Sequence, residues 1–253
     1  MLTRHPSEKA GLKTLEPGGL KILGPDGRSA LDGADIRIPV TAAEFLRGEH
    51  PEPSHILQNA FRRGQKLLLS GPSKSMKSFL LLQLAVCASS GTPWLGIPAP
   101  PCRVLLIDLE LQRCDLDKRL RRMIERLSLV PEAVNLHVAD LRHRVRGMGG
   151  LLRWLEIGGL EIGDYDLVVL DPFYKLFDAA FDSKDERDAL KILDQLNEHF
   201  LFDERRGLAL AHHFSKGSGN RGDATERPAG SSVFGREFDV LVSVSRDRSR
   251  NIR

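Results

Sequence analysis

Short apolar runs alternate with helix-like segments along most of the chain, beginning near residue 56. The apolar runs predict buried strands at residues 66–70, 103–110, 134–139, 165–172, 208–214 and 238–246. Helices are expected at residues 77–89, 115–129, 149–158 and 186–204. Continuous apolar strands separated by helices are typical of a parallel sheet with both faces covered. The pattern therefore predicts an α/β fold, with a mostly parallel sheet and helices on both faces.

Residues 1 to about 40 show no helix or strand period, because Gly, Pro and charged residues are spread through them. We expect a poorly ordered arm there, with short strands near residues 20–23 and 35–40. A short helix capped by Thr41 should follow within residues 41–50. The sequence thus predicts an N-terminal arm and lead-in over residues 1–50, partly disordered, and one globular domain over residues 51–253.

The composition is that of an ordinary soluble globular protein, with 41% hydrophobic and 28% charged residues among 253. The sequence contains no run of 18 or more apolar residues and no signal-peptide pattern. We therefore expect a cytoplasmic protein that does not enter membranes. Cys87, Cys102 and Cys114 lack metal-ligand spacing and the density of a disulfide scaffold, so we interpret them as reduced packing residues.

Basic residues are clustered locally, although the net charge of +3 is too small to indicate nucleic-acid binding by itself. The clusters lie at residues 113–126, 142–146 and 246–253. Such clusters can follow a phosphate backbone. Solvated helix faces and chain ends are also rich in Lys and Arg, so both interpretations stay open.

A phosphate-binding loop is indicated between the first core strand and its helix. Gly71, Lys77 and Ser78 fit the pattern of Gly, four residues, Gly, Lys and Ser or Thr. In such loops, main-chain N–H groups and the helix N-terminus converge on phosphates. We expect Lys77 to reach the β and γ phosphates of ATP, and the Ser78 hydroxyl to bind Mg²⁺. The expected nucleotide-binding residues are Gly71, Pro72, Ser73, Lys74, Ser75, Met76, Lys77, Ser78 and Phe79.

Met76 stands where this loop normally carries glycine. Glycine is favoured there because the backbone lies close against the phosphates and a β-carbon takes up room. If its backbone is strained, we expect methionine to weaken nucleotide binding by about 1–3 kcal/mol without abolishing it. Lys74 adds positive charge that offsets part of this loss. The alternative is a basic turn that binds no nucleotide.

Carboxylates stand at the ends of two predicted strands. An ATPase needs one carboxylate to polarise the attacking water and another to hold the metal. Asp108 and Glu110 end one strand and Asp171 ends another, at the edge of the sheet where α/β proteins bind ligands. A strand that ends in an acidic residue can also simply begin a turn.

A histidine pair ends the strand predicted at residues 208–214. A polar side chain there would contact the γ-phosphate and report its loss to the following loop. We expect His213 to do so, and His212 to be turned into the fold. Ordinary packing of both histidines is the alternative. A zinc site is not expected, since no Cys or carboxylate partner stands at ligand spacing.

Six segments together resemble the RecA-type ATPases related to the plasmid replicative helicase RepA. They are GPSKSMKSFLLLQLAV, GTPWLG, RVLLIDLE, LVVLDPFYKLF, AHHFSKG and RPAGSSVFGREFDVLVSVSR, in the same order between about residues 50 and 250. The chain is more distantly similar to the DnaB helicases and to RecA. The resemblance implies a RecA-like P-loop core with ATP between adjacent subunits. It also implies Glu110 as the base that activates water and Asp171 in the Mg²⁺ shell.

In this family, an arginine from a neighbouring subunit stabilises the transition-state charge on the γ-phosphate. Near the corresponding position the chain offers Arg236, while Asp239 stands close to where that arginine is expected. We take Arg236 as the candidate and Arg227 as the alternative.

The expected function is Mg²⁺-dependent ATP hydrolysis by a homo-oligomer, such as a hexameric ring, acting on DNA in plasmid or mobile-element replication or maintenance. Lys175 and the loop 215–232, with Lys216, Arg221 and Arg227, would contact single-stranded DNA. One alternative is a regulatory nucleotide-binding protein with weak or no turnover. Another is a recombination mediator that forms filaments.

Overall fold

The computed structural model describes residues 39–177, 186–201, 205–213 and 236–245. The chain forms two units, Met1–Pro51 and Glu52–Arg253. In the first unit, helix α1 (Ala42–Arg47) begins with a capping box. The Thr41 hydroxyl accepts from the Glu44 N–H at 3.2 Å, and the Glu44 carboxylate accepts from the Thr41 N–H at 2.9 Å. The short helix expected after Thr41 is confirmed.

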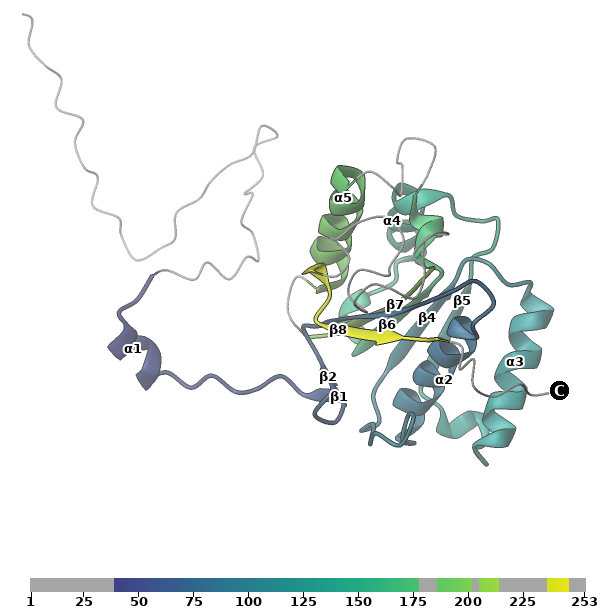
Figure 1. Ribbon diagram of the computed structural model, residues 1–253, viewed down its shortest axis with the longest axis horizontal. Coiled ribbons are helices and arrows are strands. Elements are labelled where there is room, and N and C mark those ends of the chain that lie inside the picture. The colour runs from purple at the N-terminus through teal and green to yellow at the C-terminus, as the bar shows by residue number, and fades with distance from the viewer. Residues whose placement is uncertain (1–38, 178–185, 202–204, 214–235, 246–253) are drawn as a thin grey trace, which may run out of the picture. The chain divides into compact units, whose positions relative to one another are not determined.

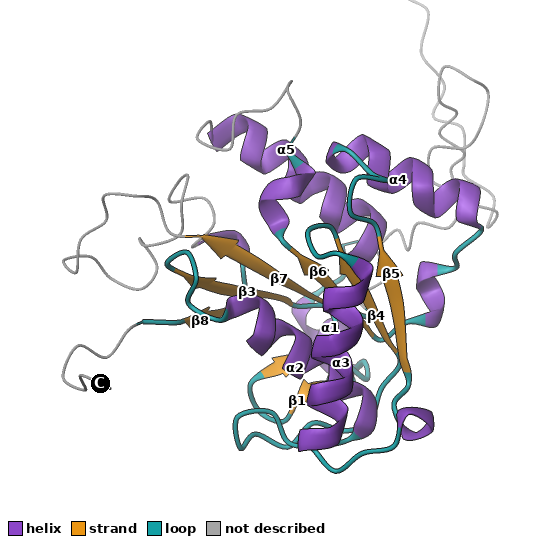
Figure 2. Cartoon of the chain, turned by 90° about the vertical axis from the view of Figure 1, so that its right-hand side faces the viewer, coloured by secondary structure: helices purple, strands orange, loops and turns teal. Residues whose placement is uncertain are grey.

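The second unit is built around one six-stranded sheet, shown in two views in Figure 1 and Figure 2. Across the sheet the strands are β5 (Leu136–Asp140), β4 (Val104–Asp108), β6 (Leu167–Asp171), β7 (Gly207–His213), β3 (Lys66–Gly71) and β8 (Val240–Ser243). Every neighbouring pair is parallel. The predicted α/β fold with a parallel sheet is confirmed, and the arrangement is consistent with a RecA-like P-loop core.

In the described part of this unit, four α-helices cover the sheet: α2 (Lys77–Ser90), α3 (Arg113–Arg126), α4 (Gly147–Gly158) and α5 (Glu186–Leu196). Helices α2 and α3 lie on one side of the sheet, and α4 and α5 lie on the other (Figure 1). The shorter elements are a hairpin of β1 (His55–Leu57) and β2 (Phe61–Arg62), the 3-10 turns η1 (Pro131–Ala133), η2 (Ile162–Asp164) and η3 (Phe173–Leu176), and the π-helical segment η4 (Asn197–Leu201). None of the described helices combines the length and apolar character that crossing a membrane requires.

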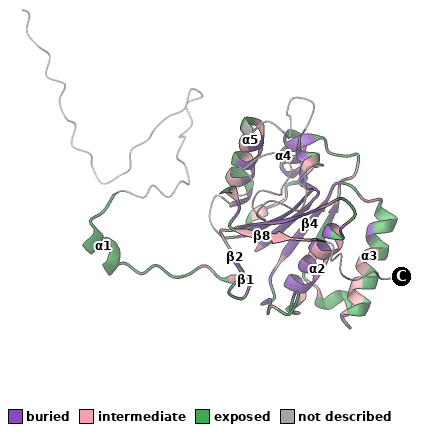
Figure 3. Ribbon diagram, in the orientation of Figure 1, coloured by how far each residue is buried: buried purple, intermediate pink, exposed green. Residues whose placement is uncertain are grey.

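The sheet has a hydrophobic core on each face because alternate strand residues point to opposite sides. Leu67 and Leu69 of β3 pack on the face covered by α2 and α3, together with Leu116 of α3. Leu68, between them, packs on the face covered by α4 and α5. Figure 3 shows the result, with the central strands buried and the outer side of α3 exposed. Two filled cores hold the strands, and therefore their ends, in a fixed register.

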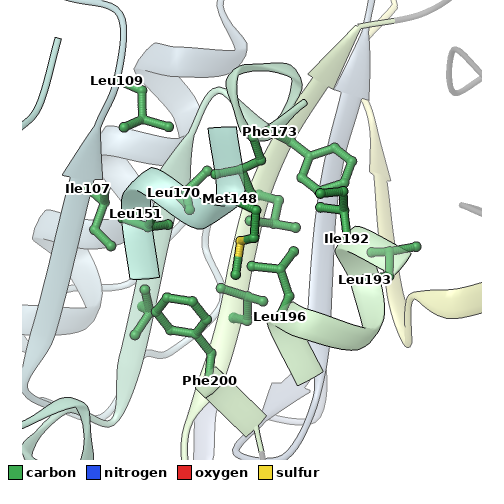
Figure 4. Packing of buried hydrophobic residues seen from close by; sticks show 14 of the residues in the cluster. Ile107, Leu109, Met148, Leu151, Leu170, Phe173, Ile192, Leu193, Leu196 and Phe200 are labelled. Carbon is green, nitrogen blue, oxygen red and sulfur yellow. The ribbon is translucent and has the colours of Figure 1, made fainter. Parts of the chain in front are cut away.

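The core under α4 and α5 is seen from close by in Figure 4. Met148 and Leu151 of α4 and Ile192 of α5 belong to one buried cluster that also includes Phe173 of η3. Phe173 is fully buried. The segment that follows Asp171 is thereby anchored to the core directly after the strand ends.

Three local features differ from the sequence prediction. The helix predicted over residues 186–204 leaves the α-helical path after Leu196 and continues as η4, and residues 202–204 lie outside the described residues. The strand predicted to reach residue 110 ends at Asp108. The β1–β2 hairpin was not predicted as a pair, because strands this short leave no detectable alternation in the sequence. The arm expected over residues 1–40 lies almost entirely outside the described residues.

The hairpin packs against the start of β7 at Gly207, and this contact can be tested. A β-carbon at Gly207 would lie 2.3 Å from Ile56 Cδ1 and 2.7 Å from Phe61 Cζ, and both side chains are buried. We expect Gly207→Ala to lower the free energy of unfolding by about 1–3 kcal/mol, because overpacking forces these side chains apart. Chemical denaturation measures the change. Gly149→Ala is the control, since its β-carbon meets nothing within 4 Å, and an equal loss there would contradict the packing argument.

Candidate functional site

The candidate site lies where β3 passes through the loop of residues 71–78 into helix α2. Helix α2 begins at Lys77, and its N-cap residue Met76 makes no side-chain capping bond. The first-turn N–H groups of the helix therefore have no side-chain cap, and the helix dipole adds partial positive charge at the same place. Both features favour an anion at this end of the helix.

Gly71 begins the loop, and close packing at this position leaves no space for a β-carbon. A β-carbon there would lie 2.7 Å from the main-chain oxygen of Val244 and 2.9 Å from Ser75 Oγ. The Val244 N–H also donates to the Ser70 oxygen at 2.8 Å, so the end of β8 is held against the loop. Main-chain atoms cannot move aside as easily as a flexible side chain, and Gly71 is therefore required where the loop leaves the sheet.

Lys77 is folded into its own loop. Its Nζ donates to the Gly71 oxygen at 2.9 Å, to the Pro72 oxygen at 2.7 Å and to Ser75 Oγ at 3.4 Å. The side chain is almost fully buried. Burial lowers the pKa of Lys77 to about 8, and the nearby charge of Asp171 opposes this shift. The three loop acceptors hold the ammonium where a phosphate could replace them.

Met76 adopts a left-handed backbone conformation, with φ 68° and ψ 13°. The conformation costs a residue with a β-carbon about 1–2 kcal/mol, whereas glycine adopts it freely. The Met76 side chain is 60% exposed. The preference for glycine at this position therefore has a conformational cause, and the side chain does not need to occupy the space of the phosphates. The sequence suggested that a β-carbon would take up space beside the phosphates, whereas the structure shows that glycine is favoured here by the left-handed backbone conformation.

Asp171 and Ser78 meet at the carboxyl edge of the sheet. The Asp171 carboxylate accepts a hydrogen bond from the Ser78 hydroxyl. Its Oδ1 is buried and has no hydrogen-bond partner among the described residues. Burial, followed by the charges of Asp108 and Glu110, raises the pKa of Asp171 to about 7, while Ser78 and Lys77 oppose the rise.

A Mg²⁺ ion would fit this pair of side chains. Mg²⁺ prefers oxygen ligands, typically one or two protein oxygens completed by phosphates and water. A buried carboxylate oxygen without a partner is costly unless a cation or a donor meets it. Ser78 and Asp171 are therefore the residues that would hold the metal, as the sequence predicted for both.

Glu110 and Asp108 follow β4, and the structure separates their roles. Asp108 lies opposite Asp171 in the register of β4 and β6. Its Oδ1 accepts from the Glu110 N–H at 3.0 Å and from the Leu111 N–H at 2.7 Å, so it closes the turn that ends the strand. Glu110 is exposed, and its carboxylate accepts a hydrogen bond from the Tyr174 hydroxyl. Of the two, Glu110 is the one that a water molecule can reach.

A cavity of about 260 Å³ lies on the loop and is lined by Lys74, Ser75, Met76, Lys77, Ser78, Phe79 and Arg119. Arg119 comes from α3, and its guanidinium carbon lies 4.5 Å from the centre of the Phe79 ring. The sequence placed Arg119 within a basic cluster without distinguishing it from its neighbours. Only the packing of α3 beside α2 singles it out, and it brings a positive charge to the loop.

The histidines at the end of β7 are distinguished by burial. His212 is buried, and its ring packs edge-on against Phe173 with 5.5 Å between centres, so the expectation that it turns into the fold is confirmed. The main chain of His213 pairs with Gly71. Its side chain lies outside the described residues, so its contact with a γ-phosphate stays a prediction.

The candidate arginine lies at the opposite edge of the sheet. Arg236 lines a cavity together with Lys66, the first residue of β3, whereas the phosphate loop follows the last residue of that strand. A strand of this length spans about 20 Å. Asp239 binds the main chain of Lys66, accepting its N–H at 2.8 Å. Arg227 and the loop 215–232 lie outside the described residues.

The left-handed conformation of Met76 leads to a direct test. We expect Met76→Gly to bind Mg-ATP at least as tightly as the wild type, because glycine adopts the left-handed conformation freely and the Met76 side chain is directed largely to solvent. Isothermal titration calorimetry measures the affinity. Met76→Ala is the matched control, since it keeps a β-carbon but removes the thioether. Markedly weaker binding by the glycine variant would show that the side chain contributes to the site.

The raised pKa of Asp171 predicts a pH-dependent stability of the metal-free protein. The folded protein holds this proton up to about pH 7, whereas the unfolded chain releases it near the ordinary carboxyl pKa of 3.8. Between about pH 3.8 and pH 7, folding is therefore accompanied by proton uptake at Asp171. The stability that the protonated Asp171 contributes is present at low pH and is lost as the pH rises through 7.

We therefore expect Asp171→Asn, in EDTA, to be more stable than the wild type at pH 8 by a few kcal/mol, with the difference shrinking towards pH 5. Thermal and denaturant unfolding across pH 5–8 measure it. Asp194→Asn, at an exposed position of α5, is the control. A difference that is independent of pH would contradict the assignment.

A family model described as an AAA domain matches residues 35–219, more than half of the chain. No curated protein matches it. Members of this family are P-loop ATPases that generally use ATP and Mg²⁺, which agrees with the loop, Ser78 and Asp171 described above. The chain belongs to this family of AAA-type P-loop ATPases, with a RecA-like core.

Proposed function

We propose that this protein is a Mg²⁺-dependent ATPase that acts on single-stranded DNA in the cytoplasm, in the replication or maintenance of a plasmid or mobile element. It would work as a homo-oligomeric ring with ATP between subunits, as a helicase-type motor. The family membership supports the ATPase at a general level. The DNA substrate, the ring and the biological process go beyond what the family membership supports and are proposed here.

The main support for ATPase activity is that residues from three chain segments lie close together at one edge of the sheet. Ser78 of α2 bonds to Asp171 at the end of β6, and Lys77 lies close enough to Asp171 for their charges to interact. Glu110 follows the neighbouring strand β4 and also interacts electrostatically with Asp171. A cation site, a phosphate site and an accessible carboxylate thus lie together.

These side chains suit in-line attack of water on a terminal phosphate. Lys77 would exchange its loop acceptors for phosphate oxygens, which compensates a buried ammonium better than carbonyl groups do. Ser78 and Asp171 would hold Mg²⁺, which neutralises charge on the phosphates when it is bound. Glu110 would accept the proton of the attacking water, and the Tyr174 hydroxyl orients its carboxylate.

The position of Arg236 supports action between subunits. Because this exposed arginine lies at the amino edge of the sheet, it cannot reach the phosphate loop of its own chain. An arginine there can meet a nucleotide only if a second subunit presents its loop to this edge. This is the arrangement that a trans-acting arginine requires.

A second candidate function is a nucleotide-dependent switch with little turnover. Two observations favour it: Met76 is held in a left-handed conformation, and Lys77 is satisfied by its own loop. Such a loop would bind nucleotide only after giving up internal hydrogen bonds. ATP binding without measurable hydrolysis by the wild type would support the switch.

Glu110→Gln separates the motor from the switch. If Glu110 is the general base, we expect turnover with single-stranded DNA to fall by at least about 100-fold, while the affinity for Mg-ATP stays within about twofold. Turnover is measured with and without a thymidine oligonucleotide, and binding with a fluorescent ATP analogue. Glu132→Gln, at an exposed position in η1, is the matched control. Unchanged turnover in Glu110→Gln would remove this residue from the chemistry.

A further inference from the structure

A further cavity, of about 760 Å³, is lined by segments that follow β4, β5 and β6 at the carboxyl edge of the sheet. The turn after β5, residues 142–147, lines it together with Lys175 and Phe177, which follow β6. Glu110, which follows β4, lines it as well. We call this cavity the basic cleft.

Among the described residues, four cationic side chains and one carboxylate, that of Glu110, line the basic cleft. Arg142, Arg144 and Arg146 come from one turn, and Lys175 faces them from the next loop. Among the described residues, neither Arg144 nor Arg146 forms a salt bridge or a side-chain hydrogen bond, and both are exposed. Like charges gathered in one hollow repel each other unless an anion lies between them. The lining is therefore complementary to a ligand with several negative charges.

The backbone of the turn contributes to the same polarity. His143 and Gly147 have positive φ values of 61° and 66°, and the turn leads directly into α4. The N-cap residue of α4, Arg146, makes no side-chain capping bond. The helix N-terminus thus adds partial positive charge to a cavity that already carries the arginines.

The lining favours phosphates over bases or small metabolites. Among the described residues that line the cleft, Phe177 is the only Phe, Tyr or Trp, and its ring packs edge-on against Phe173 with 5.2 Å between centres. Stacking of bases needs exposed aromatic faces, which this lining lacks. Cations from two separate loops, spread along an open cleft, match a chain of phosphates better than a single one.

We propose that the basic cleft binds the sugar-phosphate backbone of single-stranded DNA, so that the bound strand lies against Glu110. This inference rests on the proposed function and names the surface, formed by the turn after β5, through which DNA would act on the ATPase site. Lys175 Nζ lies 5.3 Å from the centre of the Tyr174 ring, and Tyr174 bonds to Glu110. A phosphate that engages Lys175 therefore acts on the segment that orients Glu110.

The test compares two double variants with equal loss of charge. Arg144→Ala with Arg146→Ala removes two cations from the basic cleft, and Arg122→Ala with Arg126→Ala removes two exposed cations from α3. Binding of a labelled thymidine 20-mer is measured by fluorescence anisotropy over a range of salt concentrations. Mg-ATP binding and thermal unfolding are measured alongside on the full chain.

We expect the cleft variant to bind the oligonucleotide at least about tenfold more weakly at low salt, and the α3 variant to change by less than about threefold. The slope of log affinity against log salt should decrease in magnitude by about 1.4 in the cleft variant, since each lost phosphate contact removes about 0.7. The stimulation of ATP turnover by the oligonucleotide should fall with the affinity. Arg144→Lys with Arg146→Lys keeps the charges and should retain most of the binding, which preserves the test if the alanine variant unfolds.

Each other outcome overturns the inference in a recognisable way. Equal losses of oligonucleotide affinity in the cleft and α3 variants would show that only net charge matters and would contradict the inference. The proposed function would still stand in that case, provided that the wild type binds DNA. Competition by inorganic phosphate as strong as by the oligonucleotide, at equal total phosphate, would indicate a site for small anions instead. ATP hydrolysis by a wild type that binds no oligonucleotide would end both this inference and the proposed action on DNA.

Discussion

The site depends on the burial of opposite charges at the carboxyl edge of a parallel sheet. Lys77 and Asp171 are both almost completely buried, and burial shifts the pKa of each towards its neutral form. Their mutual attraction opposes both shifts but does not cancel them. A ligand with both negative and positive groups compensates buried Lys77 and Asp171 best. A triphosphate with its divalent cation is such a ligand. The two hydrophobic cores make this arrangement possible. They fix the register of the strand ends, and their packing offsets the free-energy cost of burying the two charges.

The loop satisfies its lysine internally, and its path includes an atypical residue, Met76. Lys77 bonds to the oxygens of Gly71 and Pro72, so the loop is closed around its own ammonium. Met76 takes the left-handed conformation that this closed path requires, with its side chain directed largely to solvent. The substitution therefore costs conformational energy and leaves the space beside the main-chain N–H groups available. This strain lies in the backbone of the loop, whereas Glu110 follows a different strand, β4.

Two positively lined cavities lie at the carboxyl edge of the sheet. The cavity on the loop is lined by Lys77 and Arg119, and the basic cleft is lined by Glu110 and by the arginines of the turn after β5. The basic cleft arises because β4, β5 and β6 end at one edge, so that the segments following them are adjacent although far apart in the sequence. Tyr174 interacts with Glu110 and lies close to Lys175, which also lines the cleft. Glu110 interacts electrostatically with Asp171 as well, so it links the basic cleft to the residues of the candidate nucleotide site.

The sequence by itself determined the α/β class, the parallel strands, the loop with Lys77 and Ser78, and the strand that ends at Asp171, because continuous apolar runs and a fixed loop spacing are local properties of the chain. It also indicated that His212 turns inwards. The residue pattern alone did not separate Asp108 from Glu110 by role, and only the family resemblance implied Glu110 as the base; the turn in the structure shows that the backbone uses the Asp108 carboxylate. Nor could the residue pattern single out Arg119 from the basic face of α3, or show that the cluster at residues 142–146 lines a cavity with Glu110. Those relations join residues from different strands and helices, and only the packing of the two cores on the sheet brings them together.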